Sequence, residues 1–465
     1  MRFWTEKRIL LGMVLLYVLV FGTVTALRHY NFQTQTWDLA AFVQTFWNTT
    51  QGRIMFNNIE QASNHLGVHW TPWLFVLIPG YFLFATPYYL LFIQTLALAA
   101  GAFPLYFLAL RVLQKKNLAL LITAGYLLYP SLHWVNTFDF HEISFLVPLL
   151  LAAFYFLDAE RWWLGGLFLT LSASVREDAI PAVLFIGIFF LARKKWKIGI
   201  ITSVLALIYL ILVLKIFIPS LAGGELFRFD RYYNLGATPG EAIKNVLTDP
   251  ALVAKTVFTL PKIKYLLVLF APVAFLPFFS GSAFLLLIPG LAENLLTYFP
   301  LQFSGTYQYD SLLIPGIFIA TIYGLKKIIE KWPSKEKLVK WILITAMAIG
   351  FFARSPVSPI TFPFQLFKSN PTWETYRKLV QIVPDNASVA APTNLIPHLS
   401  NREHSYMLGK EKIIPDVVII DGADSFGFDT FENFQKYADN YINSGIYNVT
   451  IIDDRYAIMI KKGLK

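Results

Sequence analysis

The stretch FDFHEISFLVPLLLAAFYFLDAERWWLGGLFLTLSASVREDA, residues 138–179, sets the pattern of the whole chain. Its continuous apolar run, 143–157, follows a polar segment that holds Asp139, His141 and Glu142. An uncharged run of this kind is typical of a helix that crosses the hydrocarbon core of a membrane. Because ionisable groups are costly near hydrocarbon, those at the edge of the run are candidates for a functional site.

Composition extends this interpretation to the rest of the chain. Of 465 residues, 56% are hydrophobic and 15% charged, and the mean hydropathy is positive, unlike that of ordinary soluble domains. Several other windows of about 17 to 25 residues are nearly free of charge, which is the length a membrane-spanning helix needs. These windows are continuously apolar, whereas the strands of a membrane barrel would alternate, so the sequence predicts helices.

The charge distribution predicts the orientation. The formal net charge is +10, but Lys and Arg gather in short loops between apolar runs, as they do on the cytoplasmic side of membrane proteins. The basic character is therefore attributed to topology, and no nucleic-acid partner is expected. The chain has no cysteine, which excludes disulfides and thiolate chemistry. The basic and apolar start is interpreted as an uncleaved first span rather than a signal peptide.

Placing the basic loops in the cytoplasm predicts an all-α polytopic membrane bundle of about eleven spans with a cytoplasmic N-terminus. The predicted apolar runs are 9–27, 88–110, 117–133, 143–157, 162–174, 179–192, 198–218, 264–279, 283–298, 311–325 and 338–354. The runs 162–174 and 179–192 are each too short to cross a flat bilayer. Their junction, VREDA, is therefore expected below the outer surface, in a cavity or among other helices.

The membrane domain, 1–354, is expected to carry a first outer loop, 28–87, with two helices that lie parallel to the membrane. In the first, DLAAFVQTFWN, the apolar side chains recur at helical spacing and the polar ones lie opposite. That stripe consists of Leu39, Phe42, Val43, Phe46 and Trp47. The second, TPWLFVLIPGYFLFATP, is apolar but short and bounded by prolines.

The last part of the chain, 355–465, predicts a small α/β domain outside the cytoplasm. TWETYRKLVQIV and FENFQKYADNYINSG predict helices, and ASVAAP and PDVVIID predict buried strands. YNVTIIDDRYAIMIKK predicts two strands joined at Asp454 and Arg455. No internal repeat is evident, which disfavours transporters built from inverted repeats.

Polar residues on the predicted outer side are the candidates for function. They are Asp38, His65, His69, Asp139, His141, Glu142, Arg176, Glu177, Asp178, Arg228, Asp230, Arg231, Glu293 and Tyr309. Carboxylates there suit a general base or the ligands of a divalent cation such as Mg²⁺ or Mn²⁺. Arginines suit a phosphate, because the guanidinium group donates two parallel hydrogen bonds. The combination predicts a site for a membrane lipid that carries a phosphate.

Each candidate also has a structural interpretation. Asp38 has the position of a helix N-cap, and Asp139 with Glu142 has the spacing of a capping box. His65 and His69 have the spacing of a metal pair, but the sequence shows no third ligand.

Two further groups have structural interpretations as well. Arg176 with its two acidic neighbours in VREDA is compatible with a self-neutralising structural cluster. FRFDRYYN, residues 227–234, is compatible with a solvated Arg–Asp pair.

Several stretches resemble one family. They are WDLAAFVQTFWNTTQGR, HWTPWLFVLIPGYFLFATPYYLLFIQTLALAAGAFPLYFLALRVL, residues 138–179, RYYNLGATPGEAIKNVLTDP, PGLAENLLTYFP and PDNASVAAPTNLIPHLSNRE. Together they resemble the predicted membrane proteins grouped as domain of unknown function 2079, from about residue 37 to about residue 425. The layout is similar to that of the polytopic GT-C glycosyltransferases, which have two acidic outer loops and an external C-terminal domain.

The resemblance implies roles for individual residues. Asp38 matches the first-loop aspartate that is implicated in catalysis in GT-C enzymes, and Asp139 and Glu142 occupy the second acidic loop. HWTP matches the histidine that precedes a membrane-parallel helix, which adds weight to His69. Leu39 follows Asp38 where an Asp-Glu pair is commoner, so the exact base and any metal stay open.

The leading hypothesis is a glycosyltransferase that moves a sugar from a polyprenyl-phosphate donor to an acceptor outside the membrane. In it Asp38 is the base, and Asp139 and Glu142 assist it or bind a cation. The expected substrate-binding residues are His69, His141, Arg176, Glu177, Asp178, Arg228, Arg231 and Tyr309, with the three arginines holding the phosphate. The alternatives are a lipid-binding protein or transporter without covalent chemistry, and a catalytically inactive scaffold.

Overall fold

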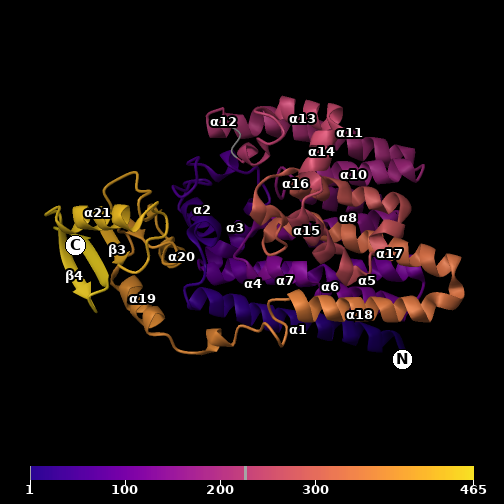
Figure 1. Cartoon of the computed structure of the whole chain (residues 1–465), viewed down its shortest axis with the longest axis horizontal. Coiled ribbons are helices and arrows are strands. Elements are labelled where there is room, and N and C mark those ends of the chain that lie inside the picture. The colour runs from indigo at the N-terminus through magenta and orange to yellow at the C-terminus, as the bar shows by residue number, and fades with distance from the viewer. Residues whose placement is uncertain (1, 225–227, 465) are drawn as a thin grey trace. The chain divides into compact units, whose positions relative to one another are not determined.

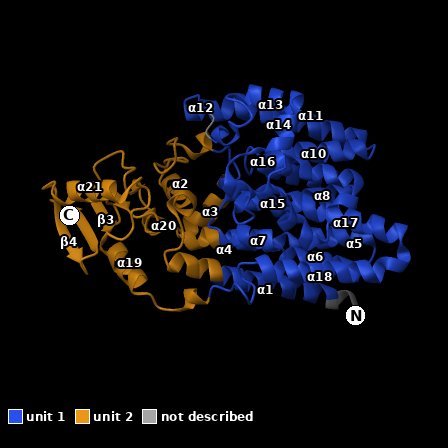
Figure 2. Ribbon diagram, in the orientation of Figure 1, with its two compact units in different colours: residues 1–23, 69–74, 93–363 blue, residues 24–68, 75–92, 364–465 orange. Residues whose placement is uncertain are grey.

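The computed structural model describes residues 2–224 and 228–464, and they pack as two compact units (Figure 2). Unit 1 consists of residues 1–23, 69–74 and 93–363, and unit 2 of residues 24–68, 75–92 and 364–465. Unit 2 therefore combines most of the first predicted outer loop with the C-terminal part of the chain.

Helices make up unit 1 (Figure 1). They are α1 (Arg2–Tyr30), which continues into unit 2, α4 (Pro87–Ala100), which begins there, α5 (Ala102–Leu113), α6 (Lys116–Leu127), α7 (Pro130–Thr137), α8 (Leu146–Asp158), α9 (Trp162–Ala173), α10 (Ala179–Ala192), α11 (Trp196–Leu212), α12 (Ile218–Ala222), α13 (Pro239–Thr248), α14 (Pro250–Val257), α15 (Leu260–Phe270), α16 (Ile288–Leu296), α17 (Ile314–Lys331) and α18 (Glu336–Arg354). Short 3-10 turns, among them Glu142–Phe145, Phe229–Tyr232 and Gln308–Leu312, connect them.

Among the described residues, three helices are long and apolar enough to cross a membrane: Glu6–Tyr30, Pro87–Leu113 and Trp196–Ala222. They coincide with the predicted spans 9–27, 88–110 and 198–218. Two bent pairs raise the number to five if each pair is one span, and the bends are 41° between α6 and α7 and 69° between α14 and the helix Leu260–Val273. The total of about eleven spans stays a prediction.

Proline explains the bend in the third predicted span. Pro130 is the first residue of α7, and the preceding Tyr129 has an extended conformation with ψ 122°. A residue before proline is disfavoured in the α-helical region, so the helix ends there and restarts in a new direction. The sequence analysis predicted one continuous span over 117–133, because an apolar run does not indicate a change of backbone conformation at a single residue.

The short predicted runs 162–174 and 179–192 form α9 and α10 as separate helices. Close approach between α10 and α11 depends on glycine. A Cβ atom at Gly187 would lie 2.8 Å from the backbone nitrogen of Ser203, and one at Gly199 would lie 2.8 Å from that of Leu191. Both distances are too short for real side chains, so these two positions let the helices touch along their backbones.

Unit 2 contains a five-stranded sheet with helices (Figure 1). Its strands are β1 (Val389–Ala391), β2 (Ser405–Met407), β3 (Val417–Asp421), β4 (Tyr447–Ile452) and β5 (Tyr456–Lys461), and its helices are α2 (Ala41–Thr50), α3 (Leu74–Leu83), α19 (Pro371–Ile382), α20 (Ile396–Leu399) and α21 (Phe431–Ile442). The strand order is β2-β1-β3-β5-β4, with β1 parallel to β2 and β3, and β5 antiparallel to β3 and β4. The predicted helices, strands and terminal hairpin of the tail are confirmed.

One hydrophobic core joins the first outer loop to the tail within unit 2. Phe32, Ala41 and Ile59 from the loop pack in the same cluster as Val389 and Ile419 from the sheet. The predicted orientation of α2 parallel to the membrane stays a prediction. Leu39, Phe42, Val43 and Phe46 of its apolar stripe are buried and Trp47 is partly buried. The polar side chains opposite, Gln44, Thr45 and Asn48, are buried as well.

The buried polar face of α2 has partners of its own. Gln44 donates hydrogen bonds to Asn58 Oδ1 at 2.6 Å and to the Glu403 carbonyl at 2.9 Å. The helix is therefore a packed element of unit 2, since buried amides require such partners. In α3, by contrast, Val76, Phe82 and Leu83 are largely exposed.

Candidate functional site

The turn between α9 and α10 holds the charged segment Arg176, Glu177 and Asp178, and each side chain has its own partner. Glu177 Oε1 lies 2.7 Å from His69 Nδ1, and Glu177 Oε2 accepts a 2.8 Å hydrogen bond from the Trp70 backbone N–H. Both carboxylate oxygens therefore hold the segment 69–74 against the turn between α9 and α10. Trp73 N–H adds a 2.9 Å hydrogen bond to the Ser174 carbonyl.

Arg176 is buried between two carboxylates. Its Nε donates to Asp178 Oδ2 at 2.8 Å, its Nη2 donates to the same oxygen, and its Nη1 lies 3.4 Å from Glu142 Oε1. The side chain of Glu142 is 1% exposed and that of Arg176 7%. This contact joins the second acidic loop to VREDA, which are 34 residues apart in sequence. The two predicted clusters therefore form one buried group.

Gln94 of α4 fixes the backbone of the second acidic loop. Its Nε2 donates to the Asp139 carbonyl at 2.8 Å, and its Oε1 accepts from the His141 N–H at 2.8 Å. The capping-box prediction is wrong, because His141 precedes the 3-10 turn, Phe145 precedes α8, and neither helix start has a side-chain cap. The side chains of Asp139, His141 and Glu142 are all buried.

A run of aromatic rings leads from this loop to Arg231. The His141 ring stacks on Phe138 at 5.4 Å, and Phe138 meets Tyr307 edge-on at 4.6 Å. Tyr307 lies 6.4 Å from Tyr309, whose ring faces the Arg231 guanidinium at 5.4 Å.

Arg231 also lies over the Phe299 ring at 4.6 Å. Within the described residues it forms no ion pair, unlike Arg176, and the predicted Arg–Asp pair of the loop 227–234 does not involve it. Arg228 begins the same turn in a left-handed conformation with φ 78°.

Glu293, in α16, connects the two arginines electrostatically. Arg176, Arg231 and Asp178 all act on its carboxylate. The Glu293 carbonyl accepts a 3.1 Å hydrogen bond from Tyr232, and Gln302 donates to Glu293 Oε1 at 3.4 Å. Glu293 was predicted to lie on the outer side, but no role was predicted for it. Its position as a single carboxylate in an otherwise apolar segment could have indicated a functional role.

Burial and ion pairing move the pKa values of the turn in opposite directions. Burial raises the pKa of Glu177, but the neighbouring His69 and Arg176 outweigh it and lower that pKa to about 2. Burial raises the pKa of Asp178 above its ordinary value even though Arg176 opposes the change. Burial lowers the pKa of Arg176, but its two carboxylate partners raise it further than burial lowers it, so the guanidinium stays charged.

In unit 2, Asp38 lies in the first turn of the short π-helical segment Thr36–Ala40 and is partly buried. The N-cap prediction is wrong, because Gln35 precedes this segment and Ala40 precedes α2.

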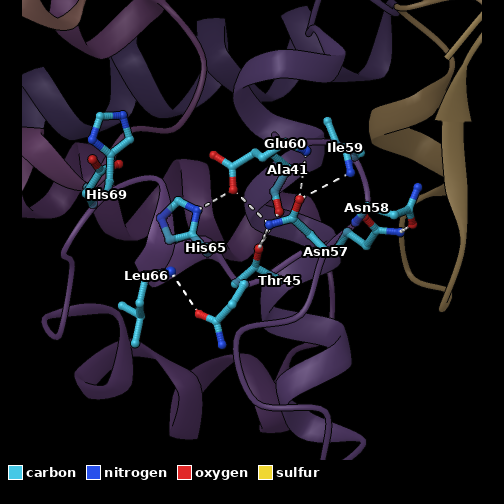
Figure 3. Close-up of polar contacts among 12 residues, drawn as sticks. Ala41, Thr45, Asn57, Asn58, Ile59, Glu60, His65, Leu66 and His69 are labelled. Atoms are coloured by element: carbon cyan, nitrogen blue, oxygen red, sulfur yellow. Dashed lines mark hydrogen bonds and ion pairs between the residues drawn. The ribbon is translucent and has the colours of Figure 1, made fainter. Parts of the chain in front are cut away.

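His65 has a different partner from His69. Its Nδ1 lies 2.7 Å from Glu60 Oε2, which also accepts from Asn57 Nδ2 at 2.8 Å, and Asn57 bonds Thr45 of α2 at 3.1 Å (Figure 3). His65 is fully buried. The spacing of the two histidines therefore does not create a metal pair.

Residues suited to a metal are not grouped in this structure. Within the described residues, no three His, Asp or Glu side chains are arranged to hold an ion. The expected divalent cation stays a prediction, and the mechanism below uses none.

The sequence matches the family model of predicted membrane proteins named DUF2079 over residues 28–457. The chain belongs to the DUF2079 family of predicted membrane proteins. No protein of curated function matches it.

The fold of this DUF2079 protein is similar to known structures. ArnT from Cupriavidus metallidurans bound to undecaprenyl phosphate gives a TM-score of 0.57 at 10% identity, with 97% of each chain covered. Its apo state gives 0.56 at the same identity and coverage. The Archaeoglobus fulgidus oligosaccharyltransferase gives 0.47 at 11% identity, covering 87% of this chain and 64% of that one. The predicted similarity to GT-C glycosyltransferases is confirmed at the level of fold.

Contacts in unit 1 thus bring together many of the predicted substrate-binding residues. His69 is paired with Glu177, and Arg176 with Asp178 and with Glu142, which was predicted as catalytic. The aromatic run connects His141, Tyr309 and Arg231. Gln94, Phe138 and Tyr307 were not predicted, because an amide or a ring in an apolar stretch carries no distinctive sequence signal.

Proposed function

We propose that this protein is a membrane glycosyltransferase that transfers a sugar from a polyprenyl-phosphate donor to an acceptor on the outer side of the membrane. The observation that carries the proposal is a charged cluster inside a unit of apolar helices, in which Glu142 and Arg176 are buried and Glu177 and Asp178 are partly buried. Burying so many charges is costly, and such groups in membrane proteins usually serve function.

The fold adds support for the substrate class. ArnT, whose fold is similar along nearly the whole chain, was crystallised with undecaprenyl phosphate. A polyprenyl-phosphate sugar has a long apolar tail for the helices and a phosphate for a cation. The exposed apolar side chains of α11, among them Leu205 and Ile211, suit such a tail.

Arg231 is the arginine best suited to the phosphate. The Arg176 guanidinium is already bonded to Asp178 and Glu142, whereas Arg231 is held by two aromatic rings and has its hydrogen-bond donors available for an anion. The role of Arg176 is then to hold the Glu142 and Asp178 side chains in place through its ion pairs. Arg228, in the same turn as Arg231, is assigned to the phosphate as well.

The reaction needs one base and no redox partner. A carboxylate takes the proton of the acceptor hydroxyl, the oxygen attacks the anomeric carbon, and the bond from that carbon to the phosphate oxygen breaks. The bonding electrons leave with the polyprenyl phosphate. Asp38 is assigned as the base from its first-loop position, with Asp139 and Glu142 assisting.

The test uses the full-length protein in lipid nanodiscs and a set of polyprenyl-phosphate sugars, with release of polyprenyl phosphate as the measurement. Asp38→Asn is expected to reduce release by at least about a hundredfold, the usual contribution of a general base. Asp429→Asn, at an exposed position of unit 2, is the matched control and should match the wild type. Undiminished release by a folded Asp38→Asn variant would remove Asp38 from the mechanism.

A further inference from the structure

A pocket of about 220 Å³ lies within unit 2, beside the turn that carries Asp38. Thr36 and Trp37 line one side of it, and Trp37 directly precedes Asp38. Glu60 and Asn58 of the first outer loop and Lys410 and Lys412 of the segment after β2 complete the polar lining.

The pocket combines the exposed aromatic ring of Trp37 with two lysine ammonium groups that form no ion pair among the described residues. Trp37 is 42% exposed, although Thr36 and Leu39 on either side of it in the segment are buried. Lys410 and Lys412 are both exposed, and neither forms an ion pair with a carboxylate among the described residues. Two adjacent ammonium groups that no carboxylate neutralises attract an anion.

Two polar side chains of the pocket, Asn58 and Glu60, are held in place by hydrogen bonds to neighbouring residues. Asn58 Nδ2 donates to the Ser405 carbonyl at 2.7 Å, and its Oδ1 accepts from Gln44. Glu60 is fixed by His65 and Asn57 (Figure 3). A side chain that its neighbours already hold in one conformation loses little conformational entropy when it binds a ligand. Such side chains are typical of a binding site rather than of a solvated surface.

We infer that this pocket binds the acceptor, and that the acceptor is a sugar that carries an anionic group. The Trp37 ring offers a flat apolar face for the sugar ring, the Glu60 carboxylate accepts hydrogen bonds from sugar hydroxyls, and Lys410 and Lys412 bind the anion. The assignment as acceptor site rests on the proposed function, because Trp37 and Asp38 belong to the same turn.

The test measures binding by the full-length protein in detergent, without any donor, so that its outcome is independent of transfer. The probes are glucose 6-phosphate, glucuronate, glucose and inorganic phosphate, titrated by calorimetry. Both anionic sugars are expected to bind at least about tenfold more tightly than glucose or inorganic phosphate, since each charged contact is worth about that factor. Equal binding of inorganic phosphate would overturn the sugar assignment, and no preference over glucose would overturn the anion assignment.

Variants then locate the binding. Trp37→Ala and the double variant Lys410→Gln, Lys412→Gln are each expected to weaken binding of both anionic sugars at least about tenfold. Lys378→Gln, an exposed lysine of α19, is the matched control and should leave binding unchanged. Binding that survives in the pocket variants would overturn the inference. Loss of transfer with retained binding in Asp38→Asn would support both proposals, whereas binding by a protein that transfers no sugar would count against the function alone.

Discussion

His69 Nδ1 lies 2.7 Å from Glu177 Oε1, although the two residues are 108 positions apart in the sequence. The pair joins the end of the first outer loop to the turn between α9 and α10. Glu177 also accepts the Trp70 N–H, so one carboxylate fixes both the side chain and the backbone of the segment 69–74.

This pair predicts a loss of stability in acid. The pKa of Glu177 is lowered from 4.5 to about 2, so its stabilising effect is complete above pH 4.5 and is lost as the pH falls towards 2. The loss amounts to at most about 3 kcal/mol of unfolding free energy. Thermal unfolding between pH 6 and 2 measures it. Glu177→Gln should be less stable at pH 6 and show a smaller loss in acid, and an identical acid profile would contradict the ion pair.

Removal of Arg176 is expected to destabilise unit 1 strongly. Arg176→Met leaves the buried Glu142 and the partly buried Asp178 without their cation, which costs about 3 to 5 kcal/mol. The double variant Arg176→Met, Asp178→Asn should recover part of the loss, because one uncompensated charge is gone. Arg161→Gln, at an exposed arginine, is the control. Denaturant unfolding checks the series, and a double variant no better than Arg176→Met would refute the pairing.

The contact between α10 and α11 predicts a strong preference for glycine at 187. Gly187→Ala places a Cβ atom 2.8 Å from the Ser203 nitrogen and is expected to destabilise the protein by about 1 to 3 kcal/mol. Gly166→Ala in α9 is the matched control, since a Cβ atom there meets nothing within 4 Å. That substitution should be neutral or stabilise the helix by up to about 1 kcal/mol. Equal melting temperatures for the two variants would show that the helices do not approach so closely.

The stacked imidazoles of unit 2 predict a second pH dependence. His398 lies on His29 with ring centroids 4.0 Å apart, and burial lowers the pKa of His398 from 6.5 to about 3. The unfolded chain therefore binds a proton that the folded chain does not between pH 6.5 and 3, so stability falls as the pH falls through this range. From pH 7 to 5 the loss is about 2 kcal/mol.

His398→Phe should remove most of that loss, because phenylalanine keeps a ring on His29 but takes up no proton. Melting temperatures at pH 7 and pH 5 provide the measurement. His404→Gln, at a partly exposed histidine of the same unit, serves as the control and should keep the wild-type dependence. If His398→Phe lost as much stability as the wild type between these pH values, the dependence would have another origin.

The sequence predicted correctly those helices and strands that are marked by the residue pattern of a single segment. The continuous apolar runs predicted α1, the span of α4 and α5, and the span that begins with α11. In hydrocarbon, the backbone N–H and C=O groups of such a run can find hydrogen-bond partners only within a helix. Alternation and turn residues predicted β4, β5 and their connection at Asp454 and Arg455, which lie in the observed turn of residues 453–455. The three-residue strand β2, SYM, was missed, whereas the equally short β1 was predicted from the apolar stretch ASVAAP.

The arrangement of α2 shows where amphipathic periodicity fails. Its stripe predicted one buried face correctly, but gave no partner for the polar face, which is buried and bonded to Asn58 and the Glu403 backbone through Gln44. Periodicity indicates which face of a helix is apolar, but it does not indicate what packs against the polar face. In α2 that contact includes Glu403, which is more than 350 residues away in the chain.

The sequence by itself determined that this chain is built mainly of apolar helices with an α/β tail, and that its acids and arginines gather in the loops between them. Only the tertiary structure decided the pairing of those charges. His65 and His69, four residues apart, take Glu60 and Glu177 as partners, and Arg176 takes Glu142 from another loop. Ion pairs form between atoms a few ångströms apart, and that proximity comes from the path of the folded backbone and not from spacing along the chain.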